Sequence, residues 1–101
     1  MFMTANTTLI KELIPAKMHL KARADNEFLI VSTKNLNVYY LNETARDFYE
    51  LIDGAATINV IIKKLMQAYE IDYATLEKDV VHLVRDLQWK QLIVLTEGDA
   101  S

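Results

Sequence analysis

Residues 36–45 read LNVYYLNETA, and within this stretch the sequence changes from the pattern of a strand to the pattern of a helix. Leu36 to Leu41 alternates between two faces and contains residues that favour strands. Asn42 is a good helix N-cap, and Ala45 and Phe48 follow it at helical spacing. The stretch therefore predicts a strand followed at once by a capped helix, in a mixed α and β fold.

Two further strands are expected before this stretch. Lys17 to Ala24 alternates between apolar and basic or polar residues, as a strand with one wet face does. Phe28 to Thr33 is a denser apolar run, typical of a central strand. Asp25-Asn26 and Lys34-Asn35 supply the turn residues between the strands. The pattern predicts an antiparallel meander of three strands.

Three helices are expected after the strands. The first is expected to stop at Gly54, because glycine enters the left-handed conformation without strain. Thr57 caps the second helix, and Asp72 caps the third, which extends to about Lys90. Leu92 to Leu95 could add a short closing strand. This order predicts an α+β domain, winged helix-turn-helix-like, with a three-stranded antiparallel sheet followed by three helices.

The composition limits both size and chemistry. The chain has 101 residues, a net charge of −3, no cysteine and two histidines, so we expect one domain without disulfides or thiolate metal sites. His19 and His82 are far apart and have no nucleophile or metal partner at a recognisable spacing. We therefore expect no catalytic residue, no metal and no cofactor.

The organisation of the chain is expected to be simple. We expect an N-terminal arm over residues 1–15, one domain over 16–95 and a flexible tail over 96–101. The apolar runs are too short to span a bilayer, and the first residues carry no secretion signal. A cytoplasmic binding protein is the expected class.

The third strand lacks the features that usually protect an exposed sheet edge. The first strand carries Lys17, Lys21 and Arg23, whereas Leu36 to Leu41 contains no charge, proline or glycine. This edge is either covered by the N-terminal arm or by Leu92 to Leu95, or it is left open for a partner strand. An open edge could also pair with a second copy, which would make a homodimer through the strand edge. The residues by themselves leave these alternatives open.

The third helix has apolar residues beyond those that a single core stripe needs. Val81 and Val84 widen the apolar surface towards the flank that also holds Glu77 and Gln88. Such a surface would suit the wall of a groove. Apolar residues on a helix surface are also common without any function. The core stripe consists of Leu76, Val80, Leu83 and Leu87.

The order of several short motifs resembles the PqqD family. Residues 40–45 (YLNETA) open the first helix, residues 51–54 (LIDG) end it, and Leu92-Ile93 closes the similarity, which covers about residues 16–95. The family is named for the peptide chaperone of pyrroloquinoline quinone synthesis. Its domain also occurs as the recognition element for ribosomally synthesised, post-translationally modified peptides (RiPPs). Many relatives carry proline in place of Glu43 and glycine in place of Gln91.

The resemblance implies a function in peptide binding. Such domains bind the leader segment of a precursor peptide as an extra strand beside the third strand, in a groove bordered by the third helix. They present the precursor to a modifying enzyme, often a radical SAM enzyme. Because Tyr39 and Tyr40 alternate sides, one should lie in the core and the other should be available to a ligand. The candidate peptide-binding residues are Leu36, Asn37, Val38, Tyr39, Tyr40, Glu77, Val80, Val81, Val84 and Gln88, with rim charges at Lys34, Lys78 and Arg85.

Two other functions compete with this interpretation. A winged-helix DNA-binding regulator would share the fold, but the third helix carries three cations against four carboxylates, which phosphate would repel. A leader-binding partner of a lasso-peptide-type protease would share the peptide site. We expect no nucleic acid and no membrane as partners.

Overall fold

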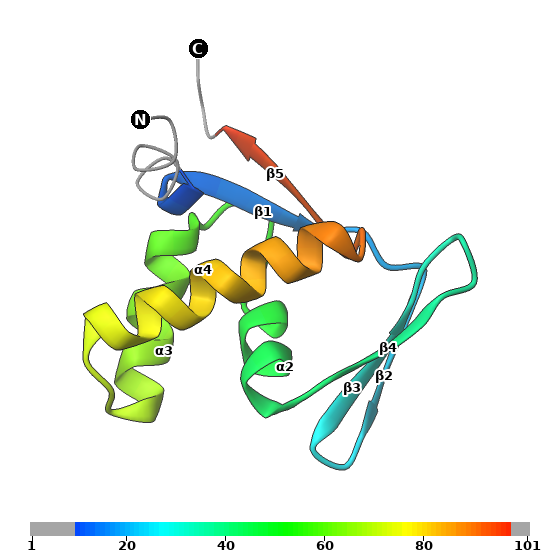
Figure 1. Cartoon of the computed structure of the whole chain (residues 1–101), viewed down its shortest axis with the longest axis horizontal. Helices are drawn as coiled ribbons and strands as arrows, with labels where there is room; N and C mark the ends of the chain where they lie inside the picture. The colour runs from blue at the N-terminus through cyan, green and yellow to red at the C-terminus, as the bar shows by residue number, and fades with distance from the viewer. Residues whose placement is uncertain (1–9, 98–101) are drawn as a thin grey trace.

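The computed structural model describes residues 10–97, which form a mixed α and β fold in which strands precede helices (Figure 1). The sheets are antiparallel, as expected, and three helices, α2 to α4, follow the first four strands. Most of the predicted N-terminal arm and flexible tail, residues 1–9 and 98–101, lies outside the described residues. In chain order the elements are β1 (Leu13–Lys17), β2 (Lys21–Asp25), β3 (Phe28–Ser32), β4 (Val38–Leu41), α2 (Glu43–Glu50), α3 (Ile58–Tyr69), α4 (Tyr73–Trp89) and β5 (Ile93–Glu97).

The first expected strand, Lys17 to Ala24, is in fact two strands in two different sheets. β1 ends at Lys17 and pairs with β5, whereas β2 begins at Lys21 and pairs with β3. The chain leaves the first sheet at Met18, whose N–H donates to the carbonyl of Leu92 over 2.8 Å. The alternating pattern continues through this change of sheet and therefore does not reveal it.

The N-terminal segment passes through its proline without a break. Ile10 and Lys11 are helical, and β1 then runs through Pro15, which lies opposite Leu95 in the β1–β5 pair. A proline is tolerated there because β1 pairs on one side only within the described chain, so no partner needs its missing N–H.

The three-stranded sheet has the order β2-β3-β4, which leaves β2 and β4 at its edges. One face packs on the helices through Leu29, Val31 and Leu41, all buried. All five residues of β2 are exposed, because this strand extends beyond the helices. Figure 1 shows the sheet projecting from the side of the helical body.

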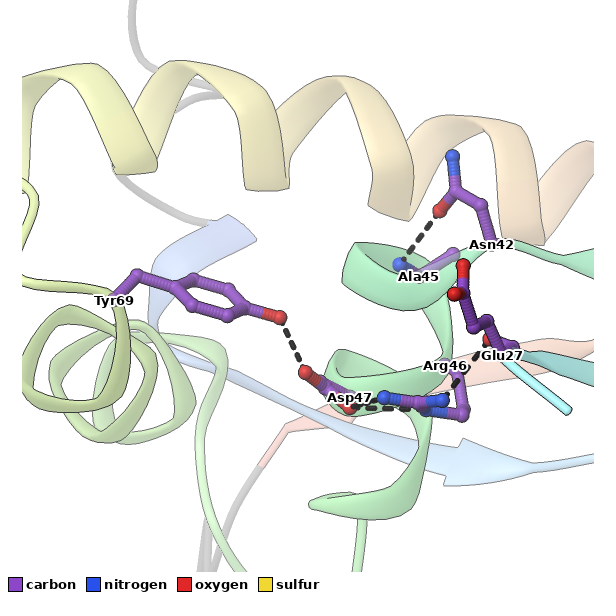
Figure 2. Close-up of polar contacts among 6 residues, drawn as sticks. All are labelled: Glu27, Asn42, Ala45, Arg46, Asp47 and Tyr69. Carbon is purple, nitrogen blue, oxygen red and sulfur yellow. Dashed lines mark hydrogen bonds and ion pairs between the residues drawn. The ribbon is translucent and has the colours of Figure 1, made fainter.

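Each helix begins where the sequence places its cap. The side chain of Asn42 accepts from the N–H of Ala45 over 3.0 Å (Figure 2), and Thr57 and Asp72 cap α3 and α4 in the same way. One end differs from the expectation, since α2 stops at Glu50, before Gly54. Gly54 lies in the following loop at φ 82°, where a side chain would be strained.

The hydrophobic core joins all three helices to both sheets. Tyr69 and Arg46 add polar contacts at its rim, where both donate to the carboxylate of Asp47, and Arg46 also donates to the carbonyl of Glu27 over 3.0 Å (Figure 2). Burial by itself would raise the pKa of Asp47, but the hydrogen bonds from Tyr69 and Arg46 outweigh it and hold that pKa below its usual range. The largest fully buried side chains are Tyr49, Phe48, Ile58, Ile61, Ile62, Leu87, Leu92, Val31, Val80, Val84 and Pro15.

Tyr49 holds the junction between the two sheets. Its buried hydroxyl donates to the carbonyl of Leu92 over 3.0 Å and lies 2.7 Å from Nδ1 of His19, in the linker between β1 and β2. Because the hydroxyl has a single hydrogen and a carbonyl can only accept, Nδ1 of His19 is the donor in this pair. The network fixes the linker against α2 and the start of β5.

Stability is expected to fall as the pH decreases below the pKa of about 6.5 that histidine has in the unfolded chain. Burial, assisted by the charge of Lys17, lowers the pKa of His19 in the folded protein, so the unfolded chain binds more protons in this range. The stabilisation is complete above the unfolded value of about 6.5 and is lost as the pH falls through the folded pKa. Urea unfolding at several pH values would measure this slope.

His19→Asn should flatten that slope, because it removes the titrating ring and keeps a donor near Tyr49. Equal slopes in the wild type and in His19→Asn would contradict the assignment.

Candidate functional site

The free edge of β4 is the most distinctive feature of the surface. β1 and β5 pair with each other, so neither the segment before β2 nor the closing strand covers β4. Of residues 10–97, none pairs with β4 on the side away from β3. The self-covered alternative therefore fails for the part of the chain that the structure describes.

The register shows which backbone groups this edge offers. The N–H of Thr33 donates to the carbonyl of Asn37 over 3.0 Å, and hydrogen-bonded pairs alternate along an antiparallel ladder. Tyr39 and Leu41, opposite Val31 and Leu29, are therefore the residues that bond to β3. It follows that Val38 and Tyr40 direct their N–H and C=O groups outward, to where an added strand would lie.

Exposed apolar side chains accompany these free backbone groups. Leu36 is 84% exposed, Tyr40 64% and Val38 55%. Tyr39 is half-buried and packs against the core, whereas Tyr40 is exposed. The two side chains lie on opposite faces of the strand, as their alternation in the sequence predicts. Asn37 is exposed at the start of the strand. The edge thus combines unused hydrogen-bonding groups with apolar surface that a partner could bury.

Leu36 is also held in a backbone conformation that disfavours its side chain. Its φ is 69°, in the left-handed region, and its N–H donates to the carbonyl of Thr33 to close the hairpin turn. A non-glycine residue is strained there by about 1–2 kcal/mol. An exposed leucine at such a position contributes little to folding.

Leu36→Gly is expected to raise the free energy of unfolding by about 0.5–1 kcal/mol, because it relieves this strain at some cost in chain entropy. On the expectation that a peptide strand adds beside β4, the same variant should weaken peptide binding roughly threefold to tenfold, through loss of an apolar contact. Urea unfolding and fluorescence anisotropy would measure the two effects.

Glu70→Gly is the matched control, since Glu70 has a φ of 55° at the end of α3. It should raise stability and leave peptide binding unchanged. A Leu36→Gly variant that binds peptide as tightly as the wild type would exclude Leu36 from the site.

The side of α4 that meets β4 is marked by Lys90. Its Nζ lies 5.2 Å from the centre of the Tyr39 ring and 2.8 Å from the carboxylate of Asp86. Asp86 and Leu83 are one and two helical turns before Lys90 and share its flank. At its end this flank contacts β4 through Lys90 and Tyr39, whereas the half-buried Leu83 packs against the core.

The flank of α4 that the sequence predicts to line a groove, which holds Glu77 and Val81, faces other elements. Glu77 forms an ion pair with Lys11, just before β1, and Val81 is 9% exposed. Val80 and Val84 have no exposed surface, so they belong to the core and do not line an open groove. The exposed Lys78 and Arg85 lie well round the helix from Lys90.

Gln88 and Lys34 do come together, at a cleft of about 370 Å³ between the β3–β4 turn and the end of α4. Asn35 donates to the side chain of Gln91 across the same junction, over 3.3 Å. Gln91 has a φ of 60° where a glycine would be unstrained. The cleft lies on the β5 side of α4, so it is separate from the edge of β4.

Asp86 and Lys90 are not among the residues predicted from the sequence, although they lie at the end of α4 that contacts Tyr39. A helical wheel shows which residues share a flank, but it does not show which neighbour each flank meets. The surplus of valines predicts a groove wall, whereas Val80, Val81 and Val84 are buried.

Comparison with protein families gives one clear result. A sequence model described as "Coenzyme PQQ synthesis protein D (PqqD)" matches residues 27–93, which is well over half of the chain and includes β3, β4 and all of α2 to α4. The chain belongs to the PqqD family. The PqqD match confirms the resemblance that the motifs indicate. Searches among curated proteins and solved structures found no match.

Membership of the PqqD family associates the chain with the synthesis of PQQ or related peptide-derived products, as an accessory protein. No helix among the described residues is long and apolar enough to cross a membrane. Within residues 10–97, no three acidic or histidine side chains gather to form a metal site.

Proposed function

We propose that this protein binds the leader segment of a ribosomally made precursor peptide and presents it to a modifying enzyme, a radical SAM enzyme. The leader adds as a strand to the edge of β4, with α4 as the neighbouring wall. The observation that carries this proposal is the open edge at Val38 and Tyr40, with exposed apolar side chains beside it.

The energetics indicate what kind of peptide fits. Val38 and Tyr40 together offer four backbone hydrogen bonds, worth roughly 0.5–1.5 kcal/mol each. Ordering each peptide residue costs about 1–2 kcal/mol, which cancels most of that gain. Affinity must therefore come from apolar side chains of the peptide, at about 1.5–3 kcal/mol for each one fully buried. A leader with two or three apolar residues at alternate positions would meet this requirement.

The charged residues near the site indicate which polar contacts the peptide could make. Lys90 and Asp86 already neutralise each other on the α4 wall, and Lys34 is the nearest exposed cation at the hairpin turn. Charges at the rim of an interface mainly affect the rate of association and the choice of partner. We therefore propose Leu36, Val38, Tyr40 and Leu83 as the main contacts, and Lys34 as a rim charge.

The remaining parts of the chain fit this role as a scaffold. In the proposed arrangement the sheet of β2, β3 and β4 serves as the wing beside a helix-turn-helix made by α3 and α4. The proposed protein is cytoplasmic and has no catalytic residues. α2 connects the wing to the body through the hydrogen bond from Arg46 to Glu27.

Titration of a fluorescein-labelled leader peptide, taken from the precursor encoded beside the gene, tests the proposal. Saturable binding read by fluorescence anisotropy is the expected result, and a scrambled peptide of the same composition is the control. Absence of saturable binding to every neighbouring precursor would refute the proposed function.

A further inference from the structure

β5 has an open edge of its own, separate from that of β4. The N–H of Met18 donates to the carbonyl of Leu92, and hydrogen-bonded pairs alternate from there along the ladder of β1 and β5. Ile93 and Leu95 therefore direct their N–H and C=O groups away from β1. Of residues 10–97, none forms a strand on that side of β5, and Figure 1 shows β5 at the periphery of the molecule.

The two edges of this small sheet are protected differently. On β1, the residue at the middle of the strand whose backbone points outward is Pro15, which has no N–H to offer. The outward positions of β5 at Ile93 and Leu95 carry neither charge nor proline. A sheet of only two strands also gains stability from a third. The edge of β1 is therefore closed to an added strand, whereas the edge of β5 can accept one.

The cleft of about 370 Å³ described above lies at the start of β5. Its apolar side consists of Met18, Ile93 and Val94, of which Met18 is 47% and Val94 42% exposed. A strand added to β5 would pass the cleft at one end, so one of its side chains would enter the cleft. The polar side comes from the β3–β4 turn and the end of α4, through Thr33, Lys34, Asn35, Gln88 and Gln91.

Thr33 has a buried hydroxyl without a partner at this cleft. The residue is 4% exposed, and its Oγ1 forms no hydrogen bond with any residue of 10–97. Its N–H and carbonyl are both used within the hairpin turn, with Asn37 and Leu36. A buried hydroxyl without a partner lowers the stability of the fold, which a valine of similar shape would not do. Because Thr33 lines the cleft, a change of its χ1 rotamer can bring the hydroxyl to a bound group.

The polar groups of the cleft favour a carboxylate as the ligand. Lys34, which is also the rim cation at the turn before β4, forms no ion pair with any residue of 10–97. Gln88 adds an amide that can donate, and no carboxylate lines the cleft. One cation balances the single charge of a carboxylate, whereas a phosphate carries more. Met18 and Val94 suit an aliphatic group beside that carboxylate.

We propose that the edge of β5 and the cleft together bind an extended, acidic segment of a partner protein. The segment pairs with the backbone of Ile93 and Leu95 as a third strand. One of its glutamates enters the cleft, where Lys34 and the hydroxyl of Thr33 bind the carboxylate. The edge of β4 stays free in this arrangement, so the inference does not rest on the proposed function.

A short acidic peptide tests the site. The probe is acetyl-Thr-Val-Glu-Val-Thr-amide, added to the isotope-labelled full chain and followed by NMR up to about 10 mM. The amide signals of Ile93 and Leu95, together with those of Thr33 to Asn35, are expected to shift most. A probe with glutamine in place of glutamate keeps the shape and loses the charge, so it should bind at least fivefold more weakly.

Variants of the protein identify the groups that bind the probe. Lys34→Glu should weaken probe binding at least fivefold, whereas Lys63→Glu makes the same change on the exposed surface of α3 and should leave binding unchanged. Thr33→Val should weaken binding about threefold. Because it also removes the unpartnered hydroxyl, it should raise the melting temperature by about 4–8 °C. The shifts at Ile93 should remain in Val38→Pro, which alters the edge of β4.

Four results would overturn the proposal. The first is the absence of shifts at Ile93 and Leu95 up to about 10 mM probe, and the second is equal binding of the glutamate and glutamine probes. The third is loss of the shifts in folded Val38→Pro, which would place the peptide at the edge of β4. The fourth is a change of the Ile93 and Leu95 signals with protein concentration alone, which would indicate that a second copy covers β5.

Discussion

Val38→Pro is expected to weaken leader binding at least about tenfold while the protein stays folded. Val38 directs its N–H outward from β4, because the ladder to β3 uses Tyr39 and Leu41. Proline removes that donor and places its ring where an added strand would approach. The loss of one hydrogen bond and the displacement of the peptide account for the expected change.

Fluorescence anisotropy with the labelled leader would measure the affinity, and circular dichroism would confirm the fold. Val38→Ala is the matched control, since it trims the side chain and keeps the N–H; it should bind more tightly than Val38→Pro. Equal affinities for the wild type and Val38→Pro, with the fold retained, would place the peptide elsewhere on the protein.

Tyr49→Phe is expected to have the largest effect on stability among single-atom changes in this chain. It removes the buried hydroxyl that donates to Leu92 and accepts from His19. Two hydrogen bonds at roughly 0.5–1.5 kcal/mol each predict a loss of about 1–3 kcal/mol. In a domain of this size, that corresponds to a fall in melting temperature of about 5–20 °C.

Urea unfolding and thermal melts would measure the loss. Tyr40→Phe makes the same chemical change on a side chain that is 64% exposed, so it should change stability by less than about 0.5 kcal/mol. Because burial raises the pKa of Tyr49 to about 12, the effect should persist up to about pH 10. A change as small in Tyr49→Phe as in Tyr40→Phe would show that the junction is held by packing alone.

Much of the secondary structure could be predicted because its signals are local. Asn42, Thr57 and Asp72 cap the helices by reaching backbone N–H groups three residues ahead, a contact within one turn of chain. The hairpins follow from turn residues between apolar runs. The left-handed conformation of Leu36 is different, since nothing in the composition of the turn indicates it.

The candidate site was predicted only in part, for a physical reason. The absence of charge between Leu36 and Leu41 indicates a strand with nothing to discourage pairing with another chain. This local feature can be read from the sequence without knowing where the strand lies in the sheet. The neighbours of α4 depend on how the helices and strands pack in three dimensions. That packing places Lys90 beside Tyr39 and Glu77 beside Lys11, and no spacing in the sequence encodes it.

The sequence by itself determined the class of fold, the helix starts and the absence of charge from the third strand, because caps, turns and alternation act between near neighbours. Only the tertiary structure decided that Leu13–Lys17 leaves the meander to pair with Ile93–Glu97. The pairing joins residues about eighty positions apart, through backbone groups that every residue carries alike. Local side-chain patterns cannot specify such a partner, whereas the packed core around Tyr49 and Leu92 brings the two strands together.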